Sequence, residues 1–185
     1  MDPDLEFMQR LQEGDDLALN ALMGRWRTPL ISFILRYLGN RDDAMDLAQE
    51  TFVRVYEHRH SFRKEAKFSS WLFSIAANLC RNQLRWRSRH PAVSLDADEE
   101  ENDARQQEDS APSPSEDAEQ RDLALAVQKE IQSLPHDLRV AILLSVYEER
   151  PHGEIAQVLG CSAKAVESRL YRAREILRGA LKKWE

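Results

Sequence analysis

The stretch that decides the fold of the C-terminal part reads Glu154-Ile155-Ala156-Gln157-Val158-Leu159-Gly160-Cys161-Ser162-Ala163-Lys164-Ala165-Val166. A short helix is predicted to end at Gly160, because glycine readily takes the left-handed conformation that a tight turn between helices needs. Ser162 is placed to cap the next helix, and Ala156 is small where the two helices must cross closely. The pattern predicts a helix-turn-helix whose second helix enters the major groove of DNA.

The predicted second helix is strongly basic. Residues 164–183 hold seven Lys or Arg against two Glu, a net charge of +5. Such side chains attract phosphates and can read guanine edges. A solvated face of an ordinary amphipathic helix would explain the charges alone. The turn residues Gly160 and Ser162 directly precede this helix at the expected spacing, however, and the combination favours DNA binding. The residues expected to point inward and hold the crossing angle are Ile155, Leu159, Val166 and Leu170.

The rest of the chain is also helical by pattern, and its low content of 6 Gly and 7 Pro agrees with this. In the C-terminal part we expect helices at about 120–133, 136–148, 152–159 and 163–183. In the N-terminal part we expect a short helix over 5–11 and a second one from Asp15 or Asp16 to about 38, with a break or kink at Thr28-Pro29. A third runs from Asp42 or Asp43 to about 58, and a fourth, capped by Ser69 or Ser70, runs from 71 to 89.

The charges divide the chain into three parts. The overall net charge is −6, yet residues 91–122 alone hold 2 Lys or Arg and 12 Asp or Glu, a net of −10, whereas each flank carries +2. This segment is rich in Asp, Glu, Ser, Pro and Gln and has almost no large apolar residue, so it cannot bury enough surface to offset the entropy of ordering. The sequence therefore predicts an all-α protein with two small domains, 1–90 and 123–185, joined by an acidic flexible linker over 91–122.

A second basic region precedes the linker. Residues 59–89 hold eight Lys or Arg and one acid, Glu65, interleaved with aromatic residues. Asn78, Arg81, Asn82 and Arg85 fall at helical spacing on the face opposite the apolar stripe, and such a ridge suits single-stranded or melted nucleic acid. Packing into a core is the alternative for the aromatic residues here, and the two readings are evenly balanced on this patch alone.

Several classes of protein are disfavoured. The acidic N-terminus does not resemble a signal peptide, and no apolar run is long enough to span a bilayer, so we expect a cytoplasmic protein. Cys80 and Cys161 are far apart and lack metal-ligand spacing, which indicates reduced thiols and no metal site. The sequence has no phosphate-binding loop and no nucleophile–base pair, so we expect neither an enzyme nor a cofactor. A response-type regulator would need a phosphoacceptor sheet or a ligand pocket, and no alternating strand pattern appears before residue 91. An adaptor protein would lack the basic helix.

The two regions and their order resemble a known family. Asp46-Leu47-Ala48-Gln49-Glu50-Thr51-Phe52, followed by Phe68-Ser69-Ser70-Trp71-Leu72-Phe73-Ser74-Ile75-Ala76-Ala77-Asn78, resembles region 2 of extracytoplasmic-function (ECF) sigma factors. Leu134-Pro135, Arg139, Glu154-Ile155-Ala156 and Val166-Glu167-Ser168-Arg169-Leu170-Tyr171-Arg172-Ala173-Arg174 resemble their region 4. The resemblance covers both domains and implies a factor that directs RNA polymerase to promoters and helps to open the DNA.

The resemblance also implies roles for particular residues. Those implied to dock on the clamp helices of the largest polymerase subunit are Asp46, Gln49, Glu50 and Val53. Those implied to capture a flipped base of the −10 element and to follow the melted strand are Ser61, Phe62, Arg63, Lys64, Lys67, Trp71, Asn78, Arg81, Asn82 and Arg85. Those implied to read the −35 element are Lys164, Glu167, Ser168, Arg169, Tyr171, Arg172 and Arg174. The implied partners are core polymerase, including its flap, promoter DNA and an anti-sigma factor.

The sequence departs from the family pattern at two places. Pro151-His152-Gly153 stands where many members carry Ser, Thr or Tyr, and Glu167 stands where some carry a basic residue. A carboxylate at residue 167 repels phosphate but can accept a hydrogen bond from a cytosine amine. The residues of this chain therefore do not define which DNA sequence it prefers at the −35 element.

Overall fold

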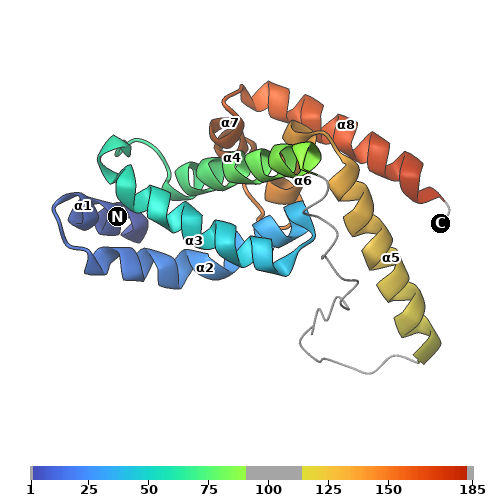
Figure 1. Ribbon diagram of the computed structural model, residues 1–185. Helices are drawn as coiled ribbons and strands as arrows, with labels where there is room; N and C mark the ends of the chain where they lie inside the picture. Colours follow the sequence, from blue (N-terminus) through green and yellow to red (C-terminus); the bar gives the residue numbers. More distant parts are fainter. Residues whose placement is uncertain (1, 91–113, 183–185) are drawn as a thin grey trace.

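The computed structural model describes residues 2–90 and 114–182, with the backbone alone for residues 114–119. These residues form helices and no strand, as the sequence predicts. The elements are α1 (Pro3–Gln12), α2 (Leu17–Leu38), α3 (Arg41–Glu57), the 3-10 turn η1 (Arg59–Ser61), α4 (Phe68–Arg89), α5 (Pro114–Ser133), α6 (His136–Val146), α7 (His152–Leu159) and α8 (Ala163–Leu181) (Figure 1).

The N-terminal lobe consists of α1 to α4. Helix α2 lies at its centre and contacts α1, α3 and α4. Its buried stripe includes Leu22, Leu30 and Phe33, which meet Leu72 and Phe73 of α4 in the core. The apolar residues recur three or four apart on each helix, so each helix turns one face inward and leaves the other to solvent.

Two predicted helix starts are wrong. Helix α3 is capped by Asn40, whose side chain accepts a hydrogen bond of 2.9 Å from the backbone N–H of Asp43, and not by an aspartate. Helix α4 begins at Phe68, and Ser69 and Ser70 lie buried within its first turn instead of capping it. Phe68 is itself buried, so the helix starts early enough to carry that ring into the core.

Of the break or kink predicted at Thr28-Pro29, the break does not occur, because α2 continues through Pro29 to Leu38. Proline removes one hydrogen bond from a helix interior and disfavours the helix there. In this chain Trp26, Leu30 and Phe33 are buried on both sides of the proline. Tertiary packing therefore maintains a helix that the local sequence disfavours.

The C-terminal lobe consists of α5 to α8. Helix α5 begins at Pro114, six residues before the predicted start, and proline is well suited to the first position of a helix. Part of the segment expected to be linker, residues 114–122, is therefore helical. The remainder of that prediction, residues 91–113, lies outside the described residues.

The two lobes pack against each other. The sequence predicts two small domains on a tether, and the structure adds an interface in which α4 lies against α7, and α2 lies against α5 and α6. Buried side chains of both lobes form one continuous apolar core. At the margin, the guanidinium of Arg150 lies 4.9 Å from the ring centre of Trp26, and Ser69 donates a 3.3 Å hydrogen bond to Glu154.

Candidate nucleic-acid interface

The turn between α7 and α8 has the geometry that the sequence predicts. Gly160 ends α7 in the left-handed conformation, with φ 59° and ψ 41°. The hydroxyl of Ser162 accepts a 3.2 Å hydrogen bond from the backbone N–H of Ala165 and so caps α8. Ile155, Ala156 and Val166 are buried, which fixes how the two helices cross. These features together form a helix-turn-helix.

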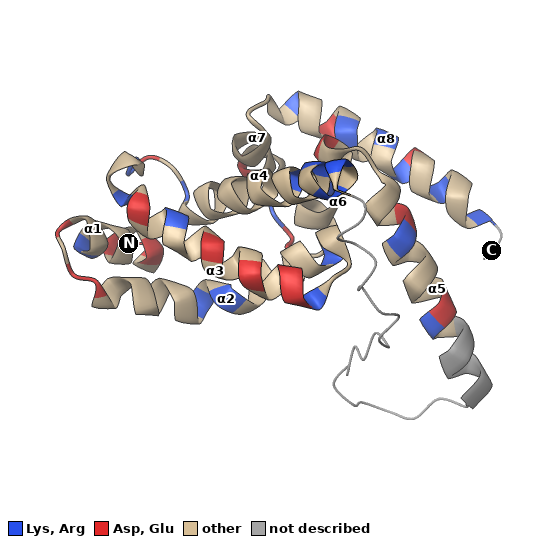
Figure 2. Cartoon of the chain, in the orientation of Figure 1, with Lys and Arg blue, Asp and Glu red and all other residues tan. Residues whose placement is uncertain are grey.

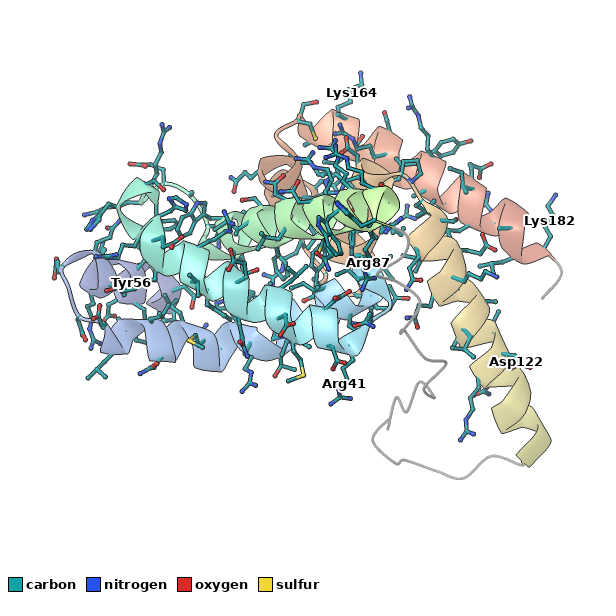
Figure 3. The ribbon with its side chains drawn as sticks, in the orientation of Figure 1. Arg41, Tyr56, Arg87, Asp122, Lys164 and Lys182 are labelled. Carbon is teal, nitrogen blue, oxygen red and sulfur yellow. The ribbon has the colours of Figure 1, made fainter. Side chains whose placement is uncertain are left out.

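The outward face of α8 carries most of the residues expected to read DNA. Tyr171 is 67% exposed, and Lys164 points away from the molecule at the start of the helix (Figure 3). Basic residues recur along the whole length of α8 (Figure 2). The expected reading residues that are exposed are Lys164, Glu167, Ser168, Tyr171, Arg172 and Arg174.

Arg169 differs from its neighbours. Its side chain is only 24% exposed, and its guanidinium donates a 2.8 Å hydrogen bond to the carboxylate of Asp137 at the start of α6. Arg169 therefore helps to join α6 to α8 in this conformation. The sequence offers no local signal for this pair, because the two residues are 32 positions apart.

Glu167 has a partner that the sequence does not predict. Its carboxylate lies 3.7 Å from Nδ1 of His152, at the first position of α7. Both side chains are well exposed, at 64% and 45%. The two positions that depart from the family pattern are therefore in contact across the turn of the helix-turn-helix.

In the basic loop before α4, residues 61–67, the charged side chains are exposed and an aromatic side chain anchors the loop. Phe62 is only 6% exposed, and its ring centre lies 5.3 Å from that of Trp71, which is half-buried. The side-chain amide of Gln12 donates to the carbonyls of Arg59 and Phe62, at 2.7 and 3.2 Å. The sequence gives no hint of Gln12, because it reaches the loop from α1. The exposed loop residues are Ser61, Arg63, Lys64 and Lys67.

The ridge predicted on α4 is present on one face of the helix. Asn78, Asn82 and Arg85 are exposed, whereas Arg81 is half-buried and donates a 2.7 Å hydrogen bond to the side chain of Asn78. The C-terminal half of α4 is the basic half (Figure 2). On another side of the helix Arg87 pairs with Asp43 of α3, so that cation belongs to the packing of the lobe.

The outer face of α3 is acidic (Figure 2) and carries the four residues expected to dock on polymerase. Asp46 and Gln49 are exposed, Val53 is 50% exposed, and Glu50 forms a 2.8 Å ion pair with Arg54. Beside them is a shallow apolar depression between α2 and α3, which sequence reasoning does not identify. It is lined by Met23, Arg27, Ile31, Met45, Ala48, Gln49 and Phe52.

Titratable groups at the interface between the lobes have shifted pKa values. Burial raises the pKa of Tyr37 to about 12. Burial, followed by repulsion from Arg81, lowers the pKa of His136. Because both groups are neutral near pH 7, the 2.7 Å contact between the Tyr37 hydroxyl and Nδ1 of His136 is a neutral hydrogen bond that joins α2 to α6. The α4 ridge therefore lies close enough to α6 to affect its electrostatics.

In the described part of the chain, no cluster of three or more His, Cys, Asp and Glu side chains is placed to hold a metal ion. Among the same residues, no helix is both long and apolar enough to cross a membrane.

Comparison with known proteins gives a consistent assignment. Residues 9–90 match the family described as Sigma-70 region 2, and residues 124–177 match Sigma-70, region 4. The chain is 34% identical to the RNA polymerase sigma-H factor of Pseudomonas aeruginosa, over 96% of this chain and 93% of that protein. It is 35% identical to the ECF RNA polymerase sigma-E factor of Escherichia coli, over 94% and 92%.

The fold also matches solved structures over nearly its whole length. CnrH, solved in complex with the cytosolic domain of CnrY, superposes with a TM-score of 0.73 at 26% identity, covering 98% of this chain and 99% of CnrH. RpoE of Bartonella quintana, solved with the anti-sigma factor NepR, has the same fold, with a TM-score of 0.65 at 24% identity, covering 88% and 96%. Both regions, their order and the helix-turn-helix agree, and the chain belongs to the ECF group of the sigma-70 family of RNA polymerase sigma factors.

Proposed function

We propose that this chain directs core RNA polymerase to specific promoters and helps to open the DNA there, with no catalytic chemistry of its own. The observation that carries the proposal is the helix-turn-helix of α7 and α8, which presents an exposed basic face in a chain whose N-terminal lobe matches region 2. Family membership supports the same role, because sigma factors are transcription initiation factors.

The −35 element is read by the exposed face of α8. Arginine recognises guanine through two hydrogen bonds in the major groove, and a carboxylate can accept from a cytosine amine. Arg172 is exposed and free of an ion pair in the described residues, whereas the guanidinium of Arg169 is held by Asp137. The proposed reading residues are Lys164, Glu167, Ser168, Arg169, Tyr171, Arg172 and Arg174.

The −10 element is captured by the loop before α4 and by the ridge on that helix. Exposed guanidinium and amide groups suit a melted strand, because its phosphates and base edges are both accessible. Since Phe62 is buried, we assign it the role of holding the loop in place. The proposed contact residues are Ser61, Arg63, Lys64, Lys67, Trp71, Asn78, Arg81, Asn82 and Arg85.

Polymerase docks on the outer face of α3. Asp46, Gln49, Glu50 and Val53 combine charge with an exposed apolar side chain, and the neighbouring depression offers apolar surface to a partner helix. Interfaces that pair apolar and charged surface in this way suit a protein partner. Region 4 is expected to meet the polymerase flap, as the family resemblance implies.

A regulatory protein partner is part of the proposal. CnrH, which this chain resembles over nearly its whole length, was solved in complex with the cytosolic domain of CnrY. The family resemblance implies an anti-sigma factor that covers the polymerase-binding and DNA-binding surfaces.

Reconstitution with core polymerase tests the proposal. Asp46→Lys combined with Glu50→Lys should abolish co-elution with core enzyme and promoter-specific transcription while leaving helix content unchanged. The matched control reverses two exposed acids away from this face, Glu13→Lys with Asp16→Lys, and should transcribe like the unmodified chain. If the first pair still co-elutes with polymerase, the docking face is assigned wrongly. If the unmodified chain supports no promoter-specific transcription with any core enzyme, the function is wrong.

A further inference from the structure

The indole of Trp86 lies on the surface near the C-terminal end of α4. The residue is 45% exposed, whereas Trp26 is 9% exposed in the core and Trp71 is half-buried in an aromatic cluster. Large aromatic side chains are normally buried because they remove much apolar area from water. An exposed tryptophan on a basic surface therefore points to a ligand.

The indole is oriented by a stacking contact with the residue that follows α4. Its ring stacks on that of His90, with 4.8 Å between ring centres and 23° between ring planes. The histidine is held in turn, since its Nδ1 lies 2.9 Å from the carbonyl oxygen of Trp86. A side chain held in this way loses less entropy when a flat ligand stacks on it.

Trp86 continues the ridge on α4 that we assign to the melted strand. Asn78, Asn82 and Trp86 are spaced by four residues and share one face of the helix. Arg85 and Arg89, both exposed, follow Arg81 along the adjacent row at the same spacing. One row thus carries amides followed by an aromatic ring, and its neighbour carries guanidinium groups.

This combination is the one that single-stranded nucleic acid requires. A basic row follows the phosphates, and an aromatic ring stacks on bases of any sequence. We propose that Trp86, oriented by His90, stacks on an unpaired base of the melted promoter strand and extends the contact of α4 beyond Asn78. Eight residues of helix separate the two side chains by about 12 Å, or three to four base steps of 3.4 Å. The inference rests on the proposed function of α4 and adds a stacking site to it.

The test uses the factor assembled with core polymerase and promoter DNA carrying an unpaired strand at the −10 element. Trp86→Ala should weaken binding of this DNA about 5- to 150-fold, the range for loss of one stacked base. Trp86→Phe, which keeps a flat ring, should recover most of the affinity. The fluorescent base 2-aminopurine is placed at successive unpaired positions of the strand. At the position that stacks on Trp86, its fluorescence quenching should be lost in Trp86→Ala but not in Trp86→Phe.

Salt dependence separates stacking from charge. Trp86→Ala should leave the slope of log affinity against log salt unchanged, whereas Arg85→Ala should reduce it by about 0.7 for a lost single-strand phosphate contact. Thermal unfolding of each variant shows whether it folds normally. If the unfolding midpoint of Trp86→Ala differs from that of the unmodified chain, Trp86→Phe becomes the deciding variant. Equal affinity of Trp86→Phe and Trp86→Leu would overturn the stacking role.

A parallel variant keeps this inference separate from the proposed function. Asn78→Ala combined with Asn82→Ala should lose binding to the unpaired strand if α4 follows it. If that variant binds normally, the proposed role of α4 fails. If it loses binding while Trp86→Ala does not, only the stacking site is overturned. A loss of polymerase assembly in Trp86→Ala, with normal DNA binding by the assembled complex, would mean that the indole contacts polymerase, and the inference would again be wrong.

Discussion

The guanidinium of Arg139, on α6, donates a 3.1 Å hydrogen bond to the backbone carbonyl of Tyr37, at the end of α2. It also donates to the carbonyls of Gln132 and Leu134, and it lies 4.6 Å from the centre of the Tyr37 ring. Arg139 is only 7% exposed, and burial lowers its pKa from the usual arginine value. One buried cation therefore ties the C-terminal lobe to the N-terminal lobe through the Tyr37 carbonyl, and its other two carbonyl partners hold it to the end of α5 within its own lobe.

Replacing Arg139 should destabilise the protein. Arg139→Met keeps much of the apolar volume but removes the donors, which leaves buried carbonyls without partners. We expect a loss of about 1.5–3 kcal/mol in the free energy of unfolding, the worth of a hydrogen bond to a charged group. Urea denaturation measures it, with Arg121→Met on the exposed part of α5 as the control, expected within about 0.5 kcal/mol of the unmodified chain. Equal stability of the two variants would contradict the role of Arg139.

His136 should make stability depend on pH. Because burial and Arg81 hold its pKa below the unfolded value, the unfolded chain binds more protons at mildly acidic pH. The stabilisation from neutral His136 is therefore fully present above about pH 6.5 and is lost as the pH falls below that value. We expect the urea midpoint to drop between pH 7.5 and 5, and to drop less in His136→Gln, which stays neutral.

Other groups around His136 determine the controls for this pH prediction. Arg85 of α4 and Arg139 of α6 oppose its protonation, whereas Asp137 favours it, so each of these side chains stays unchanged in the comparison. Glu148 acts with the opposite sign, because burial raises its pKa and its contribution is lost as the pH rises. Both proteins share Glu148, so their difference reports His136 alone. Identical pH profiles would show that His136 does not titrate differently on folding.

Two glycines should respond to alanine in opposite directions. Gly160 has φ 59°, and no atom outside its neighbours would meet an added Cβ, so Gly160→Ala costs backbone strain alone, about 1–2 kcal/mol. Gly179 lies inside α8 with the same free space, so Gly179→Ala should stabilise by about 0.5–1 kcal/mol through helix propensity. Thermal or urea unfolding decides the signs. A stabilising Gly160→Ala would mean that the left-handed turn is not maintained in solution.

The parts of the fold that sequence predicts are those specified locally. Gly160 and Ser162 specify the turn of the helix-turn-helix within a few residues, and α7 has the predicted bounds of 152–159. The burial of Ile155 and Val166 also follows from spacing alone. Each of these signals acts over one or two helical turns, so it does not depend on contacts with distant parts of the chain.

The features that sequence does not predict depend on distant partners. Arg139 reaches Tyr37 across 102 positions, and Arg169 reaches Asp137 across 32. The continuation of α2 through Pro29 depends in the same way on tertiary packing. A charge pattern shows that a side chain is basic, but it does not show whether that side chain faces DNA or a neighbouring helix.

Arg169 and Arg172, which both lie on α8, should behave differently when each is replaced. Arg172→Ala and Arg169→Ala are both expected to weaken −35 recognition by about 1–3 kcal/mol per lost base contact. Only Arg169→Ala should also lower stability, by up to about 1 kcal/mol, because it breaks the partly exposed pair with Asp137. Asp137→Ala should reproduce the stability loss but keep the −35 preference. If Asp137→Ala alters that preference as much as Arg169→Ala does, the role of Arg169 is to position the helix and not to read bases.

The packed lobes should separate when polymerase binds. Promoter elements two to three turns apart are roughly 70–100 Å from each other, whereas a compact chain of this length has a radius of gyration of only about 16 Å. The packed conformation cannot reach both elements, and the net charge of −6 gives the free factor little long-range attraction to DNA. We therefore expect weak, poorly specific DNA binding by the factor alone, and specific binding with core polymerase.

Energy transfer between the lobes measures this separation directly. Labels are placed on cysteines at the exposed positions Asn20 and Gly179, with Cys161→Ser, while Cys80 stays unlabelled because it is buried and burial raises the pKa of its thiol. Transfer should be high in the free factor and should fall on addition of core polymerase, since a fully extended stretch over residues 91–113 allows a gap of up to about 80 Å. Low transfer in the free factor would mean that the interface does not persist in solution. Tight, sequence-specific promoter binding without polymerase, with transfer still high, would contradict the requirement for opening and favour an ordinary DNA-binding regulator.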